Sequence, residues 1–371
     1  MKKITPEFKL LIIIFLLLFN LENAIGADLF GDAGLSGEYS SNIYMNMEKS
    51  PDFFLEPSLN AGIFLGGDFI GGYEGMADIF TNNRDLFYHN HELYIEWNPV
   101  WGDDDENGYY INLYIETGRN TRRFASVNIL KPGLDTGITL EPRSWFRWNM
   151  SASYNYNYFY DDIYSSSSDT FVDTSITFTL PARTTITPLV SYGIRTFTYS
   201  NMLKTDTPYD QEIIAGVHLS QNLWRGGGLQ GDYKYRYSFG DNALISTKIN
   251  ELEFNYIGED FLFTGHYAGL IFKQIFQNGL EVGAKADFST KSYNGFENFD
   301  INELPTGIMR YDQVLTGGGW LMFTRFVKES EPESTPEFST SLSYFYERQW
   351  SNNDWYNTSA NIINLEIKLS W

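Results

Sequence analysis

The sequence predicts an all-β protein, a single antiparallel transmembrane β-barrel of about sixteen strands with no plug domain; eighteen strands are the alternative. Apolar side chains recur at every second position along most of the chain, opposite charged residues. The predicted strands run to about ten to fifteen residues, which suits a tilted strand crossing a bilayer better than a globular strand of about five or six. Aromatic residues, 17% of the chain, crowd the strand ends, as girdles at two membrane interfaces require.

Residues 1–26 have the composition of a secretory signal peptide. Lys2 opens a positive start, Leu10–Phe19 is an unbroken apolar run, and Ala24–Gly26 offers small residues for cleavage. The apolar run is about half of the ~20 residues that a spanning helix needs, which argues against a membrane anchor. We therefore expect cleavage after this segment, which leaves residues 27–371 as the barrel, outside the cytoplasm.

Composition excludes several classes of partner and chemistry. A net charge of −21 provides no basic footprint, so nucleic acid is not an expected partner. The absence of cysteine excludes disulfides, thiolate metal sites, a cysteine nucleophile and a lipid anchor on an N-terminal cysteine. Only about eight residues separate the cleavage site from the first predicted strand, Leu35–Met47, and this argues against a plugged receptor.

The later strands follow from the same alternation, which is clearest at 87–98, 229–239 and 280–289. Counting from the N-terminus places longer loops outside at 161–169 and 199–210, and tight periplasmic turns at 140–144, 181–185, 224–228 and 257–260. Counting from the C-terminus places 328–336 inside and 296–307 outside. The two counts differ by one strand between about 240 and 310, so sixteen and eighteen strands both remain open.

The chain ends on a strict alternation whose apolar members are Ile363, Leu365, Ile367, Leu369 and Trp371. This pattern resembles the C-terminal assembly signal of bacterial outer-membrane β-barrels, with Trp in place of the commoner Phe. The resemblance implies an outer-membrane location and recognition of the last strand by the barrel-insertion machinery. Pairing of the last strand with the first would close the cylinder, because an open edge in hydrocarbon leaves backbone groups unsatisfied.

Weaker motifs extend the resemblance over residues 35–371. Arg310-x-Asp312 opens a strand, and Ser351-Asn352 and Tyr356 precede the last one. Together with the architecture they are similar to uncharacterised porin-like barrels of that broad family. The resemblance implies a channel or a surface role and supplies no substrate.

If the apolar faces contact lipid, the opposite faces line an aqueous interior. The acidic members of this predicted lining are Glu92, Glu96, Glu116, Asp232, Glu281, Asp287 and Glu366, and the basic members are Lys234, Arg236, Lys285 and Lys368. Acids outnumber bases, so we expect a mild preference for cations. The tyrosines of this face (Tyr88, Tyr94, Tyr110 and Tyr114) are interpreted as space-filling rather than as sugar-stacking, and the segment 294–308 is the best candidate for a constriction.

Other constellations favour structural interpretations. His89-x-His91 is interpreted as two rings at a membrane interface rather than as a zinc site, which needs further ligands. His218 and His266 have no partner in the sequence, and the acidic run Gly102–Gly108 lacks EF-hand spacing, although calcium binding there stays open. No G-x-S-x-G elbow is present, so neither an enzyme nor a cofactor is expected.

The sequence therefore predicts passive passage of small hydrophilic solutes through an outer-membrane pore. The expected partners are outer-membrane lipids and the insertion machinery, and homo-oligomerisation is left open. The alternative function is a non-conducting barrel that binds partners at the surface, supports envelope structure or assists export.

Overall fold

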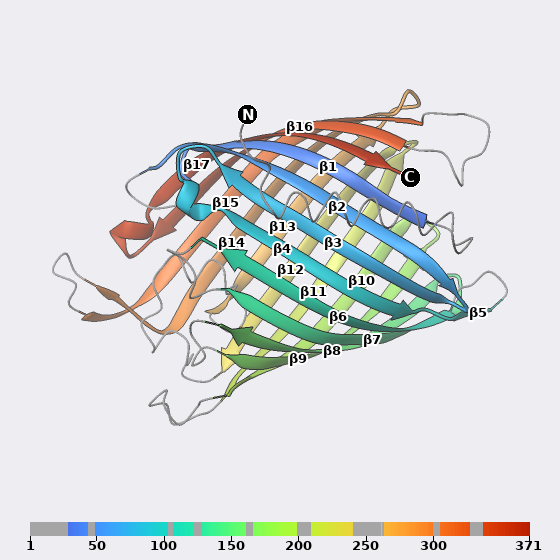
Figure 1. Ribbon diagram of the computed structural model, residues 1–371, viewed down its shortest axis with the longest axis horizontal. Helices are drawn as coiled ribbons and strands as arrows, with labels where there is room; N and C mark the ends of the chain where they lie inside the picture. Colours follow the sequence, from blue (N-terminus) through green and yellow to red (C-terminus); the bar gives the residue numbers. More distant parts are fainter. Residues whose placement is uncertain are drawn as a thin grey trace, which may run out of the picture.

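The computed structural model describes residues 29–43, 49–102, 107–121, 128–160, 166–198, 209–239, 261, 263–299, 305–326 and 337–371. The strands form one closed antiparallel barrel (Figure 1). The predicted signal peptide and residues 103–106 of the acidic run lie outside the described residues. None of the helical segments in the described ranges is long and apolar enough to cross a membrane.

The sheet has seventeen strands, of which β5 (Val100–Trp101) is a two-residue segment paired only with β6, so sixteen strands build the described wall. They are β1 (Leu29–Ser40), β2 (Asp52–Gly66), β3 (Phe69–Phe80), β4 (Tyr88–Trp97), β6 (Asn107–Asn120), β7 (Ile129–Arg143), β8 (Phe146–Phe159), β9 (Ser167–Leu180), β10 (Thr184–Phe197), β11 (Tyr209–Trp224), β12 (Gly227–Phe239), β13 (Phe263–Ile275), β14 (Leu280–Phe299), β15 (Pro305–Phe326), β16 (Glu337–Ser351) and β17 (Thr358–Ser370). The prediction of sixteen strands is confirmed.

The barrel closes where β1 pairs with β17, from Asp32↔Ser370 to Ser40↔Ile362. The backbones of Gly31 and Trp371 exchange two hydrogen bonds of 2.9 Å, so the last residue completes the ring. The predicted first strand, Leu35–Met47, was placed too late, because β1 begins at Leu29. Because β1 must pair with β17 as far as Trp371, it has to begin before Leu35, where the clear alternation of the sequence starts.

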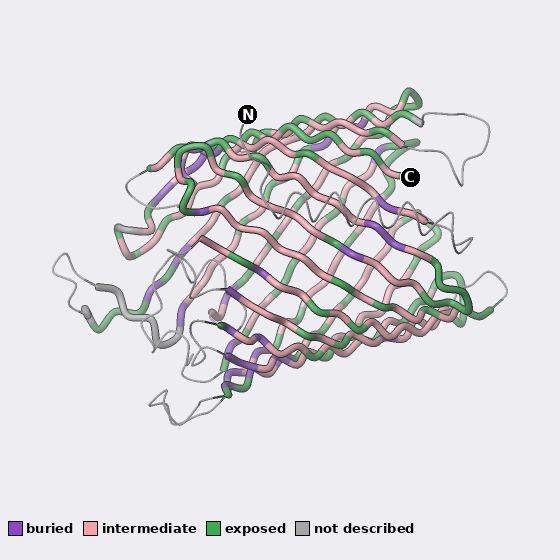
Figure 2. The backbone as a smooth tube through the Cα atoms, viewed as in Figure 1, coloured by how far each residue is buried: buried purple, intermediate pink, exposed green. Residues whose placement is uncertain are grey.

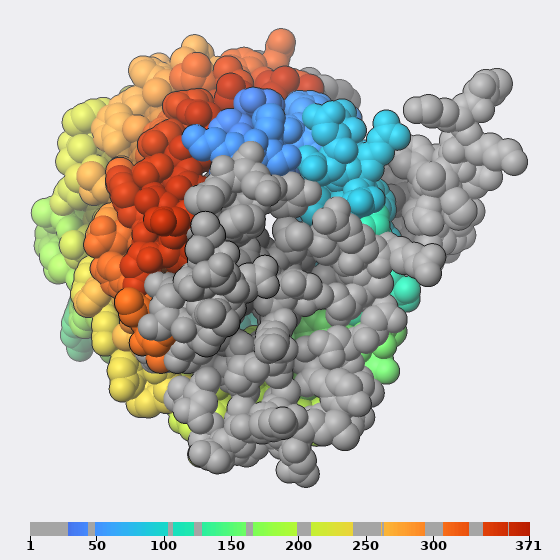
Figure 3. Space-filling view, turned by 90° about the vertical axis from the view of Figure 1, so that its left-hand side faces the viewer, coloured from blue at the N-terminus to red at the C-terminus, as the bar shows by residue number. Residues whose placement is uncertain are grey.

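The two ends of the barrel differ. The short-turn end carries the connections at 67–68, 144–145, 181–183, 225–226 and 276–279, together with the start of β1 and the end of β17. The long-loop end carries most of the longer connections, and Figure 3 looks onto it, with β1 (blue) beside the C-terminal strands (red). Three of the four turns predicted to share one side (140–144, 181–185 and 224–228) lie together at the short-turn end.

The fourth turn, predicted at 257–260 on the short-turn end, is wrong. β12 pairs directly with β13, so no barrel strand is inserted between them, and residues 240–262 are one connection at the long-loop end. The predicted turn itself lies outside the described residues. The sequence of this connection alternates as a wall strand does, and this explains why the two strand counts from the sequence differ by one.

The segment 294–308, predicted as the best candidate for a constriction, continues the β14–β15 hairpin in its described part, and its role as a constriction stays a prediction. β14 and β15 continue to pair beyond a register shift, with Glu297 opposite Met309 and Phe299 opposite Pro305. Backbone pairing therefore extends this hairpin past the rim, and residues 300–304 lie outside the described part.

The exterior of the barrel is apolar and the interior is polar. On β4, Leu93 and Ile95 are 59% and 54% exposed, and cross-strand partners share a face, so the register assigns every wall position to one side. No Asp or Glu with a described side chain occupies the face of these exposed apolar residues. This orientation is the one required by a surrounding bilayer.

The interior does not form a dry core. Only eight apolar side chains of the described residues are buried, and the purple segments in Figure 2 gather mainly toward the long-loop end. Many of the buried residues are polar or charged, including Asp169, Arg195, Glu212, Arg310 and Asp312. The long-loop end is therefore closely packed by hydrogen-bonded groups, while the rest of the wall surrounds a lumen.

Candidate functional site: the lumen wall

The eleven charged residues predicted to line the lumen all lie opposite the exposed apolar face. Glu92 and Glu96 belong to β4, Glu116 to β6, the residues Asp232, Lys234 and Arg236 to β12, the residues Glu281, Lys285 and Asp287 to β14, and Glu366 and Lys368 to β17. Their contact with a passing solute stays a prediction.

A row of carboxylates crosses three strands on one side of the lumen. Glu74 on β3 is directly opposite Glu92, which is directly opposite Glu116 on β6. The row ends at Lys131 on β7, whose Nζ lies 2.8 Å from Glu116 Oε2, and Asn90 donates to the other oxygen of Glu116. Directly opposed like charges destabilise a sheet, so this row costs folding free energy.

Sequence reasoning missed Glu74 because glycines interrupt the alternation of β3 at Gly71, Gly72 and Gly75. Its position two residues before Met76 would have placed it on the inner face once the register of the β3–β4 hairpin was known.

A cavity of about 310 Å³ lies beside this row. Its lining includes Asp32, Glu74, Glu92, Asn60, Asn90 and Lys368. Lys368 Nζ is 3.1 Å from Asp32, which joins the seam strands β1 and β17 by an ion pair. The cavity is therefore mainly anionic.

Basic residues concentrate on the other side of the ring, on β12, β13 and β14. Lys234, Arg236, Lys273, Lys285 and Lys291 all face the lumen there. Counting around sixteen strands, β12–β14 stand eight positions from β3, β4 and β6, so the two groups face each other across the pore. The lumen thus carries a charge separation across its width.

Several of these bases are neutralised by neighbours on the same wall. Lys273 Nζ lies 2.8 Å from Glu281 and Lys285 Nζ lies 2.6 Å from Asp287. Glu281 also accepts a hydrogen bond from Trp320 Nε1 at 2.8 Å. Within the described part of the chain, the acidic row has Lys131 as its one ion-pair partner, so the net field of the lumen is negative on that side.

At the long-loop end the chain enters the lumen at Phe261. Its side chain is fully buried, and its backbone N–H donates to Glu212 Oε2 at 2.8 Å. Its ring centroid lies 5.3 Å from that of Phe171, and Arg195 Cζ lies 4.7 Å above it. Phe171, Arg195 and Glu212 belong to β9, β10 and β11, so Phe261 lies against the inner faces of three strands although it directly precedes β13 in the sequence.

The motifs Arg310-x-Asp312, Ser351-Asn352 and Tyr356 come together at the same end. Arg310 Nε donates to Asp312 at 2.9 Å, and the guanidinium carbon lies 3.3 Å from the ring centroid of Tyr356 and 4.6 Å from that of Tyr293. Asp312 also accepts a hydrogen bond of 2.6 Å from Ser351. These contacts fasten the short helix η5 (Asp354–Tyr356) to the rim.

Three of the four histidines lie on the outer face. His91 Nδ1 is 2.7 Å from the hydroxyl of Tyr73, and its Nε2 is 3.0 Å from His89 Nδ1. His266 Nδ1 is 2.8 Å from the hydroxyl of Tyr233, which supplies a partner that the sequence alone did not reveal. Hydrogen bonds among rings satisfy polar atoms on this apolar face.

His218 is the one histidine on the inner face, and the structure supplies partners that were not identified from the sequence. Asp232 and Ser220 each lie within 2.8 Å of one of its ring nitrogens. The signal was present in the sequence: His218 and Ser220 are two residues apart on one strand, and the 224–228 turn folds Asp232 back beside them.

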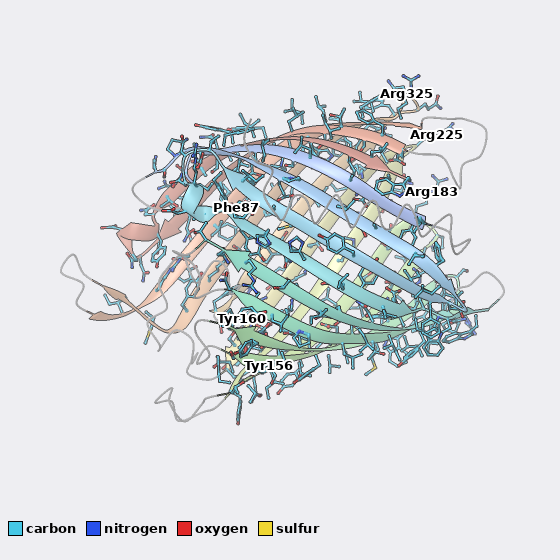
Figure 4. The ribbon with its side chains drawn as sticks, viewed as in Figure 1. Phe87, Tyr156, Tyr160, Arg183, Arg225 and Arg325 are labelled. Carbon is cyan, nitrogen blue, oxygen red and sulfur yellow. The ribbon has the colours of Figure 1, made fainter. Side chains whose placement is uncertain are left out.

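Aromatic and basic residues mark the two ends of the wall. In Figure 4, Phe87, Tyr156 and Tyr160 lie toward the long-loop end, whereas Arg183, Arg225 and Arg325 lie at the opposite end. Rings at the edge of an apolar band and arginines beyond it are typical of residues at a membrane interface.

No family model matches the chain, and no curated protein matches it. Among solved structures, OprB of Pseudomonas putida is 9% identical, over 95% of this chain and 96% of that one, with a TM-score of 0.52. A bacterial polysaccharide outer-membrane secretin (8% identity, 92% and 97% coverage) and Pseudomonas aeruginosa OpdK with vanillate (9%, 93% and 99%) give TM-scores of 0.48 and 0.44. The likeness to OprB shows a shared barrel fold.

Proposed function

We propose that the chain is a porin-like channel of the bacterial outer membrane, through which small hydrophilic solutes diffuse. The observation that carries this proposal is the closed sixteen-strand wall with an apolar exterior and a charged interior. A barrel of this strand number is wide enough to leave an aqueous lumen unless something fills it. The shared fold with OprB supports the same reading.

The lining favours a mild preference for cations. Seven carboxylates and four bases make up the lining predicted from the sequence. In the carboxylate row on β3–β6 only Glu116 forms an ion pair among the described residues, whereas Lys273 on β13 and Lys285 on β14 are paired with neighbouring acids. Charged residues that line a pore bias which ions enter it, so the unpaired acids should decide the sign.

The proposal includes a route to the membrane. The segment 1–26 would direct export and be removed, and the last strand would be recognised by the insertion machinery through Ile363, Leu365, Ile367, Leu369 and Trp371, which face outward. The apolar exterior would contact outer-membrane lipids. Oligomerisation is compatible with this surface, but no particular residue requires it.

Planar-bilayer recording of the purified barrel tests the channel. Steady current steps, with a reversal potential on the cation-selective side in a KCl gradient, are expected. Silence over many insertions of protein that is folded in detergent would favour a non-conducting surface barrel. Current with an anion-selective reversal potential would keep the channel and overturn the cation preference.

A further inference from the structure

Three lumen side chains on β11 and β12 form a chain of hydrogen bonds that the pore does not need. Asp232 Oδ1 lies 2.8 Å from His218 Nδ1, and Ser220 Oγ lies 2.7 Å from His218 Nε2. The imidazole therefore has a carboxylate on one nitrogen and a hydroxyl on the other. This order of acid, base and hydroxyl is the one that activates a serine as a nucleophile.

The hairpin positions these groups through its register. His218 and Ser220 are two residues apart on β11 and so share its inner face, and Asp232 is directly opposite His218 on β12. The turn between the strands depends on Gly226, whose φ of +77° favours glycine. The side chains of His218 and Asp232 are 31% and 24% exposed, so these hydrogen-bonded groups are accessible from the lumen.

The surroundings of Ser220 leave space for a reacting group. Gln230 is directly opposite Ser220, is exposed, and forms no side-chain hydrogen bond with the described residues. Next to it on the inner face is Gly228, where an added Cβ would meet nothing nearer than a backbone oxygen at 3.6 Å. Backbone N–H groups here are engaged in the sheet, so the Gln230 amide is the available donor for an oxyanion.

We propose that Ser220, His218 and Asp232 form a hydrolytic triad in the pore wall that cleaves carboxylic esters of small water-soluble solutes. The substrate class follows from the face that the triad occupies. Leu219 and Tyr233, the alternate residues of the two strands, are each 45% exposed on the outer face, so the triad faces water and not lipid. A lipid ester in the bilayer cannot reach Ser220 without entering the lumen.

The reaction balances with water as the only co-reactant. His218 Nε2 takes the proton of Ser220 Oγ while Oγ bonds to the ester carbonyl carbon, and the alcohol leaves with that proton. Water then attacks the acyl-serine, His218 takes one of its protons and returns it to Oγ, and a carboxylic acid is released. Asp232 fixes the imidazole tautomer and stabilises the imidazolium, and the Gln230 amide donates to the oxyanion.

Labelling with a water-soluble fluorophosphonate, mapped by mass spectrometry, tests the nucleophile directly on the folded full-length barrel in detergent. We expect label on Ser220 and hydrolysis of p-nitrophenyl acetate above background. S220A should abolish both signals. H218Q should lower the hydrolysis rate by about 100-fold or more because the general base is lost, and D232N should lower it by disturbing the tautomer.

S343A is the matched control, since Ser343 also faces the lumen, on β16, opposite Trp320 and Asn364 and away from any histidine. It should leave labelling and hydrolysis unchanged. Heat-modifiable migration on gels verifies folding, and S220A removes only one oxygen atom. Equal labelling of Ser220 and Ser343, or equal hydrolysis by wild type and S220A, would overturn the triad whether or not the barrel conducts.

Discussion

Arg310 is a charged residue at the rim on which the stability of a buried ion pair depends. The residue is 6% exposed, and its guanidinium is paired with the fully buried Asp312 and enclosed by Tyr293 and Tyr356. R310M should lower the free energy of unfolding by about 3–5 kcal/mol, because Asp312 would keep a buried charge without its partner. Urea unfolding of the folded barrel, followed by tryptophan fluorescence, measures the loss.

R348M is the control for this prediction. Arg348 lies on the outer face of the neighbouring strand β16, near Trp350, with its guanidinium carbon 5.7 Å from that ring. An exposed contact of this kind contributes about 0.5–1 kcal/mol. A loss in R310M no larger than in R348M would show that the rim does not depend on the buried pair.

Glu92 is the centre of the carboxylate row and should dominate the selectivity of that wall. E92Q removes the charge opposed on both sides by Glu74 and Glu116, so the reversal potential should move toward anions. The barrel should also resist urea better, by about 0.2–1 kcal/mol, since two like-charge pairs are relieved.

D173N is the matched neutralisation, because Asp173 also faces the lumen, on β9, away from the row. It should move the reversal potential less than E92Q and leave stability unchanged. Equal shifts in the two variants would mean that the number of charges, and not their arrangement in a row, sets selectivity.

At the scale of elements, β17 combines closure and recognition. It pairs with β16 on one edge and with β1 on the other, yet Trp371 projects outward and is 37% exposed. W371A leaves the backbone pair with Gly31 intact. We therefore expect fewer assembled barrels in cells but normal refolding of the purified chain into detergent, measured as the heat-modifiable fraction on gels.

L342A is the control for this assembly prediction, since Leu342 is 49% exposed on the same outer face, on β16. It should assemble as wild type in cells. Equal defects in cells for both variants, or a refolding defect for W371A alone, would contradict recognition of the terminal side chain and favour a simple contribution to stability.

The period of two was enough to predict the inner face of each well-patterned strand, because side chains alternate strictly once a segment is extended. It placed Glu92 and Lys285 correctly on the inner face, but it carried no information on the residue at which pairing between two strands begins. The start of β1 is fixed by partners elsewhere in the chain: Gly31 pairs with Trp371 at its other end, and Leu29 pairs with Ile63 of β2.

Alternation also cannot tell a wall strand from an alternating segment inside a connection. Residues 240–262 were misread for this reason, and the entry of Phe261 into the lumen was missed with them. The pairing of His218 with Asp232 was accessible in principle, because a tight hairpin fixes its own register.

At the scale of the whole molecule, charge separation arises from ring size. No local feature of β4 indicates that it faces β13; the two strands are opposite only because sixteen strands close the wall. In a barrel of eighteen strands, the acidic row would face other strands across the lumen. Strand number, which the sequence left open, therefore determines which side chains face one another across the lumen.

Phe261 should set the width of the long-loop end. Its ring is seated against Phe171 and Arg195 across the inner face, and it is fully buried there. F261A removes the ring from the lumen together with its contacts to Phe171 and Arg195. Single-channel conductance at a fixed KCl concentration should therefore rise. Stability should fall, by up to the about 3–5 kcal/mol typical of a buried Phe→Ala change.

F338A is the control for F261A, because it also removes an aromatic ring, but from the outer face of β16, where Phe338 is 39% exposed. Its conductance should equal that of wild type. If F261A conducts no better than F338A although both remain folded, then the narrowest part of the pore lies elsewhere, and the carboxylate row opposite β12–β14 becomes the place where solutes are selected.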